Sequence, residues 1–109
     1  MQVSLINANW VDADAIGQCI SQQVRYSLRR GDRVQVYTPH PPHRVPADLA
    51  ALARIVTPDD LAARRDPHFA QSDLYVYHYP ARHPLMDSLL TLERGAVIFY
   101  YHNVTPPVL

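Results

Sequence analysis

Lysine is absent from this sequence of 109 residues, in which all ten basic residues are arginine. Without lysine, the chain can form neither a Schiff base nor the lysine contact of a phosphate-binding loop. Glycine is scarce as well, since Gly17, Gly31 and Gly95 are its three occurrences. A Gly-x-Gly-x-x-Gly fingerprint for dinucleotides is therefore missing.

Cysteine and glutamate each occur once, as Cys19 and Glu93. A single cysteine excludes an internal disulfide, and its place between apolar neighbours on an expected helix favours a buried structural thiol over a reactive one. Because the one glutamate is expected at a helix end, acid–base catalysis by paired carboxylates has little support. The sequence also lacks the Gly-x-Ser-x-Gly turn of a serine nucleophile.

Neither sign of charge is in excess, because ten acidic residues balance the ten arginines. A neutral chain offers no electrostatic basis for binding nucleic acid. The sequence has no charged leader followed by an apolar run and no stretch of about 20 apolar residues. We therefore expect a cytoplasmic location, with peripheral contact at the inner membrane face as a further option. A hydrophobic content of 48% predicts one folded domain with its own core.

Short apolar runs alternate with helical patterns along the whole chain. The first helix is expected to carry an apolar stripe of residues that recur every four positions, namely Ile16, Ile20, Val24 and Leu28. Strands joined by helix-length connections predict a parallel sheet with right-handed crossovers. The expected fold class is α/β, a Rossmann-like doubly wound parallel sheet of about five strands with helices on both faces. The expected strands are 2–7, 33–38, 55–56, 73–79 and 96–102, and the expected helices are 12–30, 46–53, 57–65 and 84–94.

The first strand–helix turn offers one candidate binding segment, Asp12-Ala13-Asp14-Ala15-Ile16-Gly17. Backbone N–H groups at a helix start can hold an anion, but two aspartates repel phosphate at close range. A hydroxyl-rich acceptor fits this turn better than a nucleotide, although either aspartate can instead cap the helix. Gly17 allows close packing on the sheet or, alternatively, the close approach of a ligand.

The end of the sequence is its most informative part. The apolar run from Ala96 to Tyr101 passes into His102-Asn103-Val104-Thr105-Pro106-Pro107. Ligands of open parallel sheets bind beyond the carboxyl ends of the strands, so this segment is a candidate site. In the usual strand order (third, second, first, fourth, fifth) the fifth strand lies at an edge, yet it is apolar on both faces. We therefore expect further strands in a longer protein.

Four histidines, His40, His43, His78 and His102, fall at or just beyond expected carboxyl ends of strands. His102 can bind a sugar hydroxyl or a phosphate oxygen, or it can fix its loop through a backbone carbonyl. His78 can line the cleft or brace the neighbouring loop. His40 and His43 lack the further ligands that zinc needs, so no metal site is expected.

Three segments together resemble a known family: Asp73–Tyr79, Pro84-Leu85, and Val97–Pro107 with its His-Asn-Val-Thr-Pro-Pro ending. They are similar to the amino-terminal domain of the retaining, two-domain group 1 glycosyltransferases, which have the GT-B fold. The Asp14–Gly17 segment is similar to the same group. The chain departs from the family at Asn7–Val11, which replaces a glycine-rich turn, and at the bulky Tyr79–His83 segment.

The resemblance implies that residues 1–109 are the partial, acceptor-side Rossmann-like domain of such an enzyme, and that the donor-binding carboxyl-terminal domain is absent. The donor would be a nucleotide-diphosphate sugar, the acceptor a sugar or glycolipid, and transfer would proceed with retention and without a metal. His102 would point toward the donor sugar or its phosphates. Asp14 and Gly17 would lie near the substrates at the first loop, and His78 would line the acceptor side.

Asn103 and Thr105, in the same motif as His102, complete the expected substrate-binding residues. Thr105-Pro106-Pro107 is compatible with a rigid lip at the site and with a helix start. The isolated chain is expected to be inactive. The alternative hypothesis is a free-standing, flavodoxin-like binding module without catalysis, in which self-association would cover the fifth strand.

Overall fold

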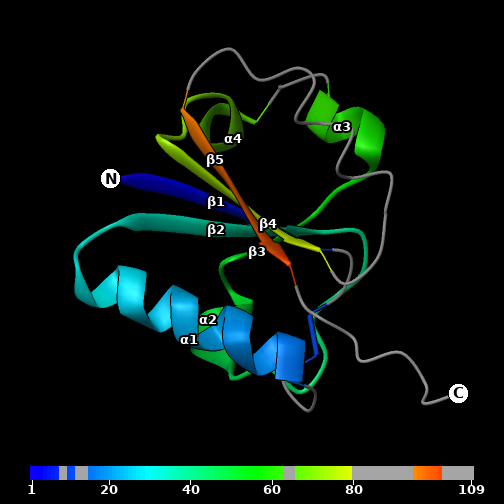
Figure 1. The fold of residues 1–109 in the computed structure, drawn as a ribbon. Helices are drawn as coiled ribbons and strands as arrows, with labels where there is room; N and C mark the ends of the chain where they lie inside the picture. The colour runs from blue at the N-terminus through cyan, green and yellow to red at the C-terminus, as the bar shows by residue number, and fades with distance from the viewer. Residues whose placement is uncertain (8–9, 12–14, 63–65, 80–94, 102–109) are drawn as a thin grey trace, which may run out of the picture.

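The computed structural model describes residues 1–7, 10–11, 15–62, 66–79 and 95–101. The described part forms one sheet with helices on both faces (Figure 1). The elements are β1 (Gln2–Ile6), α1 (Ala15–Arg29), β2 (Arg33–Thr38), α2 (Ala47–Ala50), β3 (Ala53–Ile55), α3 (Pro58–Ala62), α4 (Pro67–Ala70), β4 (Leu74–Tyr79) and β5 (Ala96–Tyr101).

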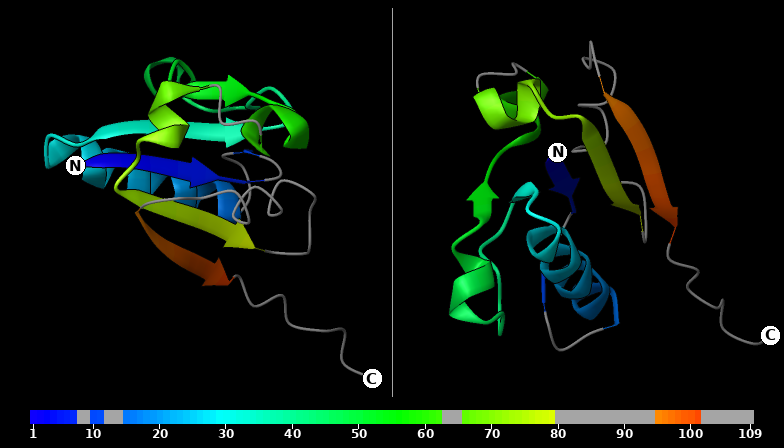
Figure 2. Two further views of the ribbon diagram at one scale, coloured as in Figure 1. Left: turned by 90° about the horizontal axis from the view of Figure 1, so that it is seen from above. Right: turned by 90° about the vertical axis from the view of Figure 1, so that its left-hand side faces the viewer.

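The five strands are all parallel and lie in the order β3-β2-β1-β4-β5. This arrangement confirms the expected doubly wound α/β fold and the expected strand order. The chain steps outward from β1 to β2 and β3, and then returns to place β4 and β5 on the other side of β1 (Figure 2). The order therefore reverses between β1 and β4, which is where open α/β sheets form their ligand crevice.

Alternation along the strands separates two hydrophobic cores. On the face covered by α1 and α2, the strand register aligns two apolar rows, Val34-Val3-Leu74 and Val36-Leu5-Val76. Ile20 and Val24 of α1 and Leu49 of α2 pack against these rows and are fully buried. The alternate positions of β1 and β2 that point to the opposite face include the polar residues Ser4, Arg33 and Gln35, so the apolar rows are continuous only on the face covered by α1 and α2.

The opposite face, which α3 and α4 cover, has an aromatic core. The ring of Phe69 in α4 makes edge contacts with Tyr37 and Tyr75, at centroid distances of 5.4 and 5.2 Å. All three rings are buried, and the Tyr75 hydroxyl donates a hydrogen bond to the Phe69 carbonyl. Edge-to-face ring pairs add about 1 kcal/mol each beyond the burial of their surface. This cluster therefore fixes the short helix α4 to the centre of the sheet.

Tyr37 makes the folded protein less stable as the pH rises in the alkaline range. Burial raises the pKa of its hydroxyl above the ordinary value, and the negative charge of Asp66 raises it further. In the unfolded chain the hydroxyl loses its proton above a pH of about 10, whereas the folded protein keeps it. The stability associated with the protonated Tyr37 hydroxyl is therefore fully present below a pH of about 10, and it is lost as the pH rises above that value.

We expect Tyr37 to lower the free energy of unfolding by about 1.4 kcal/mol per pH unit above a pH of about 10. Urea unfolding over a pH series would measure this slope. Tyr37→Phe should make the slope shallower by that amount, whereas Tyr26→Phe, which changes an exposed ring, should leave it unchanged. Equal slopes for the wild type and Tyr37→Phe would contradict the prediction.

Two helix ends agree with the expected helix bounds, the end of 12–30 and the start of 57–65. Gly31 has a φ of +85°, and its N–H donates to the Leu28 carbonyl at 3.0 Å, while Asp32 N–H donates to the Ser27 carbonyl at 3.0 Å. These bonds form the left-handed motif that ends α1. At the start of α3, Thr57 Oγ1 accepts from Asp60 N–H at 3.1 Å and Asp60 Oδ2 accepts from Thr57 N–H at 3.0 Å. This reciprocal pair is a capping box.

The structure corrects the expectations between β2 and β4. The helix expected at 46–53 ends at Ala50, because the Leu52 carbonyl accepts from Val36 N–H of β2 at 3.0 Å and draws the chain into β3. The third strand therefore begins earlier than the expected 55–56. Helix α4 was not expected, although Asp66 caps it by accepting from His68 N–H at 2.9 Å.

Two expectations about α1 also need correction. Leu28 is 42% exposed instead of buried. Residues four apart drift by about 40° around a helix, so the stripe that buries Ile20 and Val24 rotates off the sheet at Leu28. Cys19 is half-buried and not enclosed in the core. The expected helix at 84–94 lies outside the described residues.

Candidate functional site

A row of polar side chains lies at the carboxyl end of the three central strands, on the face covered by α1. The register pairs Ile6 with both Tyr37 and Tyr77. The next positions of the three strands are Asn7, Thr38 and His78, with exposed fractions of 2%, 0% and 3%. The two apolar rows below thus end in a buried polar row at the point where the strand order reverses.

His78 connects this row to α1. Its Nε2 lies 2.7 Å from Gln23 Oε1, and because the amide oxygen only accepts, Nε2 carries the hydrogen. The contact joins residues 55 apart in the sequence and ties β4 to α1. This geometry fits the bracing alternative for His78. A substrate contact from the same nitrogen would require His78 to leave Gln23.

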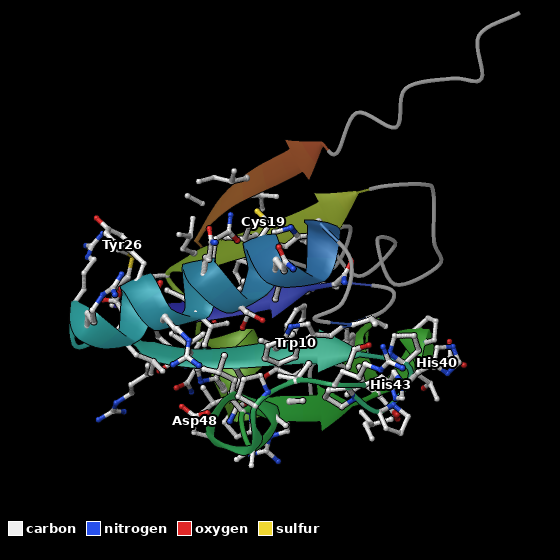
Figure 3. All side chains as sticks on the ribbon, turned by 90° about the horizontal axis from the view of Figure 1, so that it is seen from below. Trp10, Cys19, Tyr26, His40, His43 and Asp48 are labelled. Carbon is white, nitrogen blue, oxygen red and sulfur yellow. The ribbon has the colours of Figure 1, made fainter. Side chains whose placement is uncertain are left out.

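Trp10 anchors the loop that follows β1. Its side chain is fully buried, and its indole Nε1 donates to Ser21 Oγ of α1 at 3.1 Å. Its carbonyl accepts from His43 N–H at 2.9 Å, and Val11 forms a parallel bridge with His43. Figure 3 shows Trp10 between α1 and β2, with His40 and His43 beyond the end of β2. The loops after β1 and β2 are therefore held together.

The exposed histidines at this edge serve no shared site in the described structure. Thr38 Oγ1 donates to the His40 carbonyl at 3.2 Å, so the contact involves the backbone and not the imidazole. Among the described residues, no group of three or more His, Cys, Asp or Glu side chains could hold a metal ion. The polar row of Asn7, Thr38 and His78 has hydrogen-bond donors and acceptors but no carboxylate or arginine, so these three side chains offer hydrogen bonds without a fixed charge.

The predicted site residues fall into two groups. Gly17 is buried in the first turn of α1, in agreement with close packing on the sheet, and His78 occupies the polar row. The remaining predicted residues, Asp14, His102, Asn103 and Thr105, lie outside the described residues. His102 follows β5 directly in the sequence, and β5 pairs with β4 through His78 and Tyr100.

Sequence reasoning did not assign roles to Asn7, Thr38 or Gln23. Asn7 and Thr38 each end a recognisable strand, but the register that places them level with His78 follows only from the sheet. Gln23 carries no sequence signal, because the helical pattern does not indicate a partner for a glutamine that lies beside the apolar stripe.

In comparisons with protein-family models, curated proteins and solved structures, none matched this chain. Within the part of the chain that the structure describes, no helix is both long enough and apolar enough to cross a membrane. The functional argument therefore depends on the geometry of the carboxyl edge and on the sequence resemblance.

Proposed function

We propose that this chain is the acceptor-side, amino-terminal part of a retaining glycosyltransferase with two facing Rossmann-like domains. The complete enzyme would transfer a sugar from a nucleotide-diphosphate sugar to a sugar or glycolipid acceptor. Residues 1–109 alone would lack turnover, because the diphosphate of the donor would be held by the second domain.

One observation carries this proposal: β4 and β5 pair directly, from Leu74 with Ala96 to Tyr79 with Tyr101. These are the two strands on which the resemblance depends. The sheet pairs them on the β4 side of the switch point, so the carboxyl ends of β4 and β5 lie at the same edge. Two segments that are distant in sequence thus end at the edge where a ligand crevice is expected, and His102 follows the second of them in the sequence.

The proposed roles follow this arrangement. His102 would contact the donor sugar or its phosphates, and Asn103 and Thr105 would contribute to the same wall. Asp14 would contact the substrates from the segment before α1. His78 would act as a positioning residue through Gln23. This description replaces direct lining of the acceptor side by His78, because its ring is 3% exposed.

The decisive experiment sequences the source gene past the codon for Leu109 and assays both the 109-residue chain and the product of any longer reading frame. The assay would measure release of nucleoside diphosphate from a panel of nucleotide sugars. We expect release only from the longer protein. His102→Ala should lower its kcat at least tenfold, on the order of one lost charge-assisted hydrogen bond. His43→Ala, which removes an exposed imidazole, should leave kcat unchanged.

Enzyme-like turnover by the 109-residue chain would refute the proposal, and so would a longer protein in which His102→Ala and His43→Ala behave alike. A stop codon after Leu109 would favour the alternative, a binding module that associates with itself. One observation supports that alternative: Val97 and Ile98 of the edge strand β5 are 38% and 47% exposed. Sedimentation of the chain would then show a dimer, whereas a well-folded monomer would count against it.

A further inference from the structure

A second candidate site lies below the polar row, between α1 and the strands β1 and β4. It is a cavity of about 350 Å³ with an aliphatic floor of Val3, Leu5, Leu74 and Val76. Its other wall is α1, where Cys19 faces β4 and β5 and Tyr26 lies toward the end of the helix (Figure 3). The volume is within the range of small-molecule sites, and an apolar lining with few polar groups is typical of them.

The charged groups of the cavity lie at one end, around Asp32, whereas Gln22 and Gln23 of α1 are polar groups farther along its wall. The Asp32 side chain is 6% exposed, and its carboxylate lies 3.3 Å from the Met1 amino nitrogen and 3.7 Å from Arg30 Nε. Both cationic groups therefore face Asp32, and a second carboxylate, Asp73, accepts from Gln2 N–H at 2.9 Å beside Met1. An anionic group on a ligand would therefore be held by the donors of Arg30 and not by an excess of positive charge.

Arg30 is the group best placed to receive that anion. Its guanidinium carbon lies 5.8 Å from the centre of the Tyr26 ring, which supports it from one side. Within the described part of the chain, the guanidinium donates no hydrogen bond, since Asp32 at 3.7 Å is beyond hydrogen-bond distance. Its planar fork of donors is therefore available to bind a carboxylate through two parallel hydrogen bonds.

We propose that this cavity binds a medium-chain carboxylate, with the aliphatic tail on the four floor residues and the carboxylate on Arg30. The apolar floor accommodates the tail, and the free donors of the Arg30 guanidinium accommodate the head group. The cavity reaches Gln23, the hydrogen-bond partner of His78, but the argument for the ligand does not depend on sugar transfer.

The experiment titrates the full 109-residue chain with decanoate, below its micelle concentration, by isothermal titration calorimetry. Decanol and decylamine, which keep the tail but change the head group, are the comparison ligands. We expect decanoate to bind at least tenfold more tightly than either, because a charge-assisted hydrogen bond contributes that order of affinity. Arg30→Gln should weaken decanoate to the level of decanol, whereas the neighbouring Arg29→Gln, outside the cavity, should have no effect.

Cys19 reports where the ligand binds, because it is the single thiol of the chain and lines the cavity. Decanoate should slow its alkylation by iodoacetamide in the wild type and in Arg29→Gln, but not in Arg30→Gln. Circular dichroism would establish that both variants are folded.

Four results would overturn the proposal. They are equal binding of all three ligands, equal loss in the two arginine variants, and binding to phosphatidylglycerol vesicles without binding of free decanoate. The fourth is a dimer that protects Cys19 in the absence of ligand, which would make a second copy of the chain the occupant.

Discussion

Gly95→Ala is expected to lower the free energy of unfolding by about 3 to 4 kcal/mol, as the sum of a backbone conformational cost and a steric cost. Gly95 has a φ of +87°, in the left-handed region. A Cβ at this position would lie 2.8 Å from the Ser72 carbonyl oxygen, 2.8 Å from Tyr75 Cε2 and 3.2 Å from the Asp73 carbonyl oxygen. Two of these three atoms belong to the backbone, so they cannot move aside cheaply.

Gly31 provides a matched control for the steric cost of Gly95→Ala. Its φ of +85° is nearly the same, but a Cβ there would meet nothing within 4 Å. Gly31→Ala should therefore cost only the conformational term, about 1 kcal/mol. Urea unfolding of the two variants would measure the difference. Equal losses would show that the close approach of β5 to the Ser72–Tyr75 segment is not tight in solution.

The position of Gly95 also predicts which strand Gly95→Ala destabilises most. Ala96 N–H donates to the Asp73 carbonyl at 2.9 Å and starts the pairing of β5 with β4. A side chain at Gly95 would push this first contact apart, and β5 has no other neighbour among the described strands. Hydrogen exchange should therefore accelerate in β5 amides more than in β1 amides.

The sequence predicted those parts of the fold that depend on local chemistry. Strand β2 and the stop at Gly31 are set by an apolar run and by a residue that tolerates positive φ, and both were predicted at the right positions. Helix α2 and strand β3 were misplaced because Leu52 bonds to Val36, a contact between segments whose pairing no local pattern indicates. Helix α4 was missed although Asp66-Pro67 is a cap followed by proline, a signal that the sequence does contain.

The candidate site also has features that the local sequence predicts and features that depend on contacts between distant segments. Histidines at strand ends were visible in the sequence, and His78 is indeed at the carboxyl end of β4. Its partner Gln23 was not predictable, because the contact depends on how α1 crosses the sheet. The bulky Asn7–Val11 segment, which departs from the glycine-rich turn of the resembled family, also has a structural explanation. Trp10 is a core residue, buried beneath α1 with Val3 and Leu5.

Trp10→Ala is expected to lower the free energy of unfolding by about 3 to 5 kcal/mol, the usual loss for a fully buried large aromatic side chain. The indole fills the core between α1 and the sheet, and its N–H donates a hydrogen bond to Ser21 Oγ at 3.1 Å. Far-ultraviolet circular dichroism would follow unfolding in urea, because the variant loses the single tryptophan that fluorescence would otherwise report.

A double-mutant cycle separates packing from hydrogen bonding at this position. Trp10→Phe keeps a ring but removes the hydrogen bond that Ser21 Oγ accepts, and Ser21→Ala removes the acceptor of the buried indole N–H, so each should cost about 1 to 3 kcal/mol. Both variants lose this same hydrogen bond, so the double variant should lose less than the sum of the two. Additive losses would mean that the indole N–H is solvated. The loop after β1 would then be held mainly by the hydrogen bond from His43 N–H to the Trp10 carbonyl. This part of the carboxyl edge would be less rigid than a fully buried, hydrogen-bonded indole would make it.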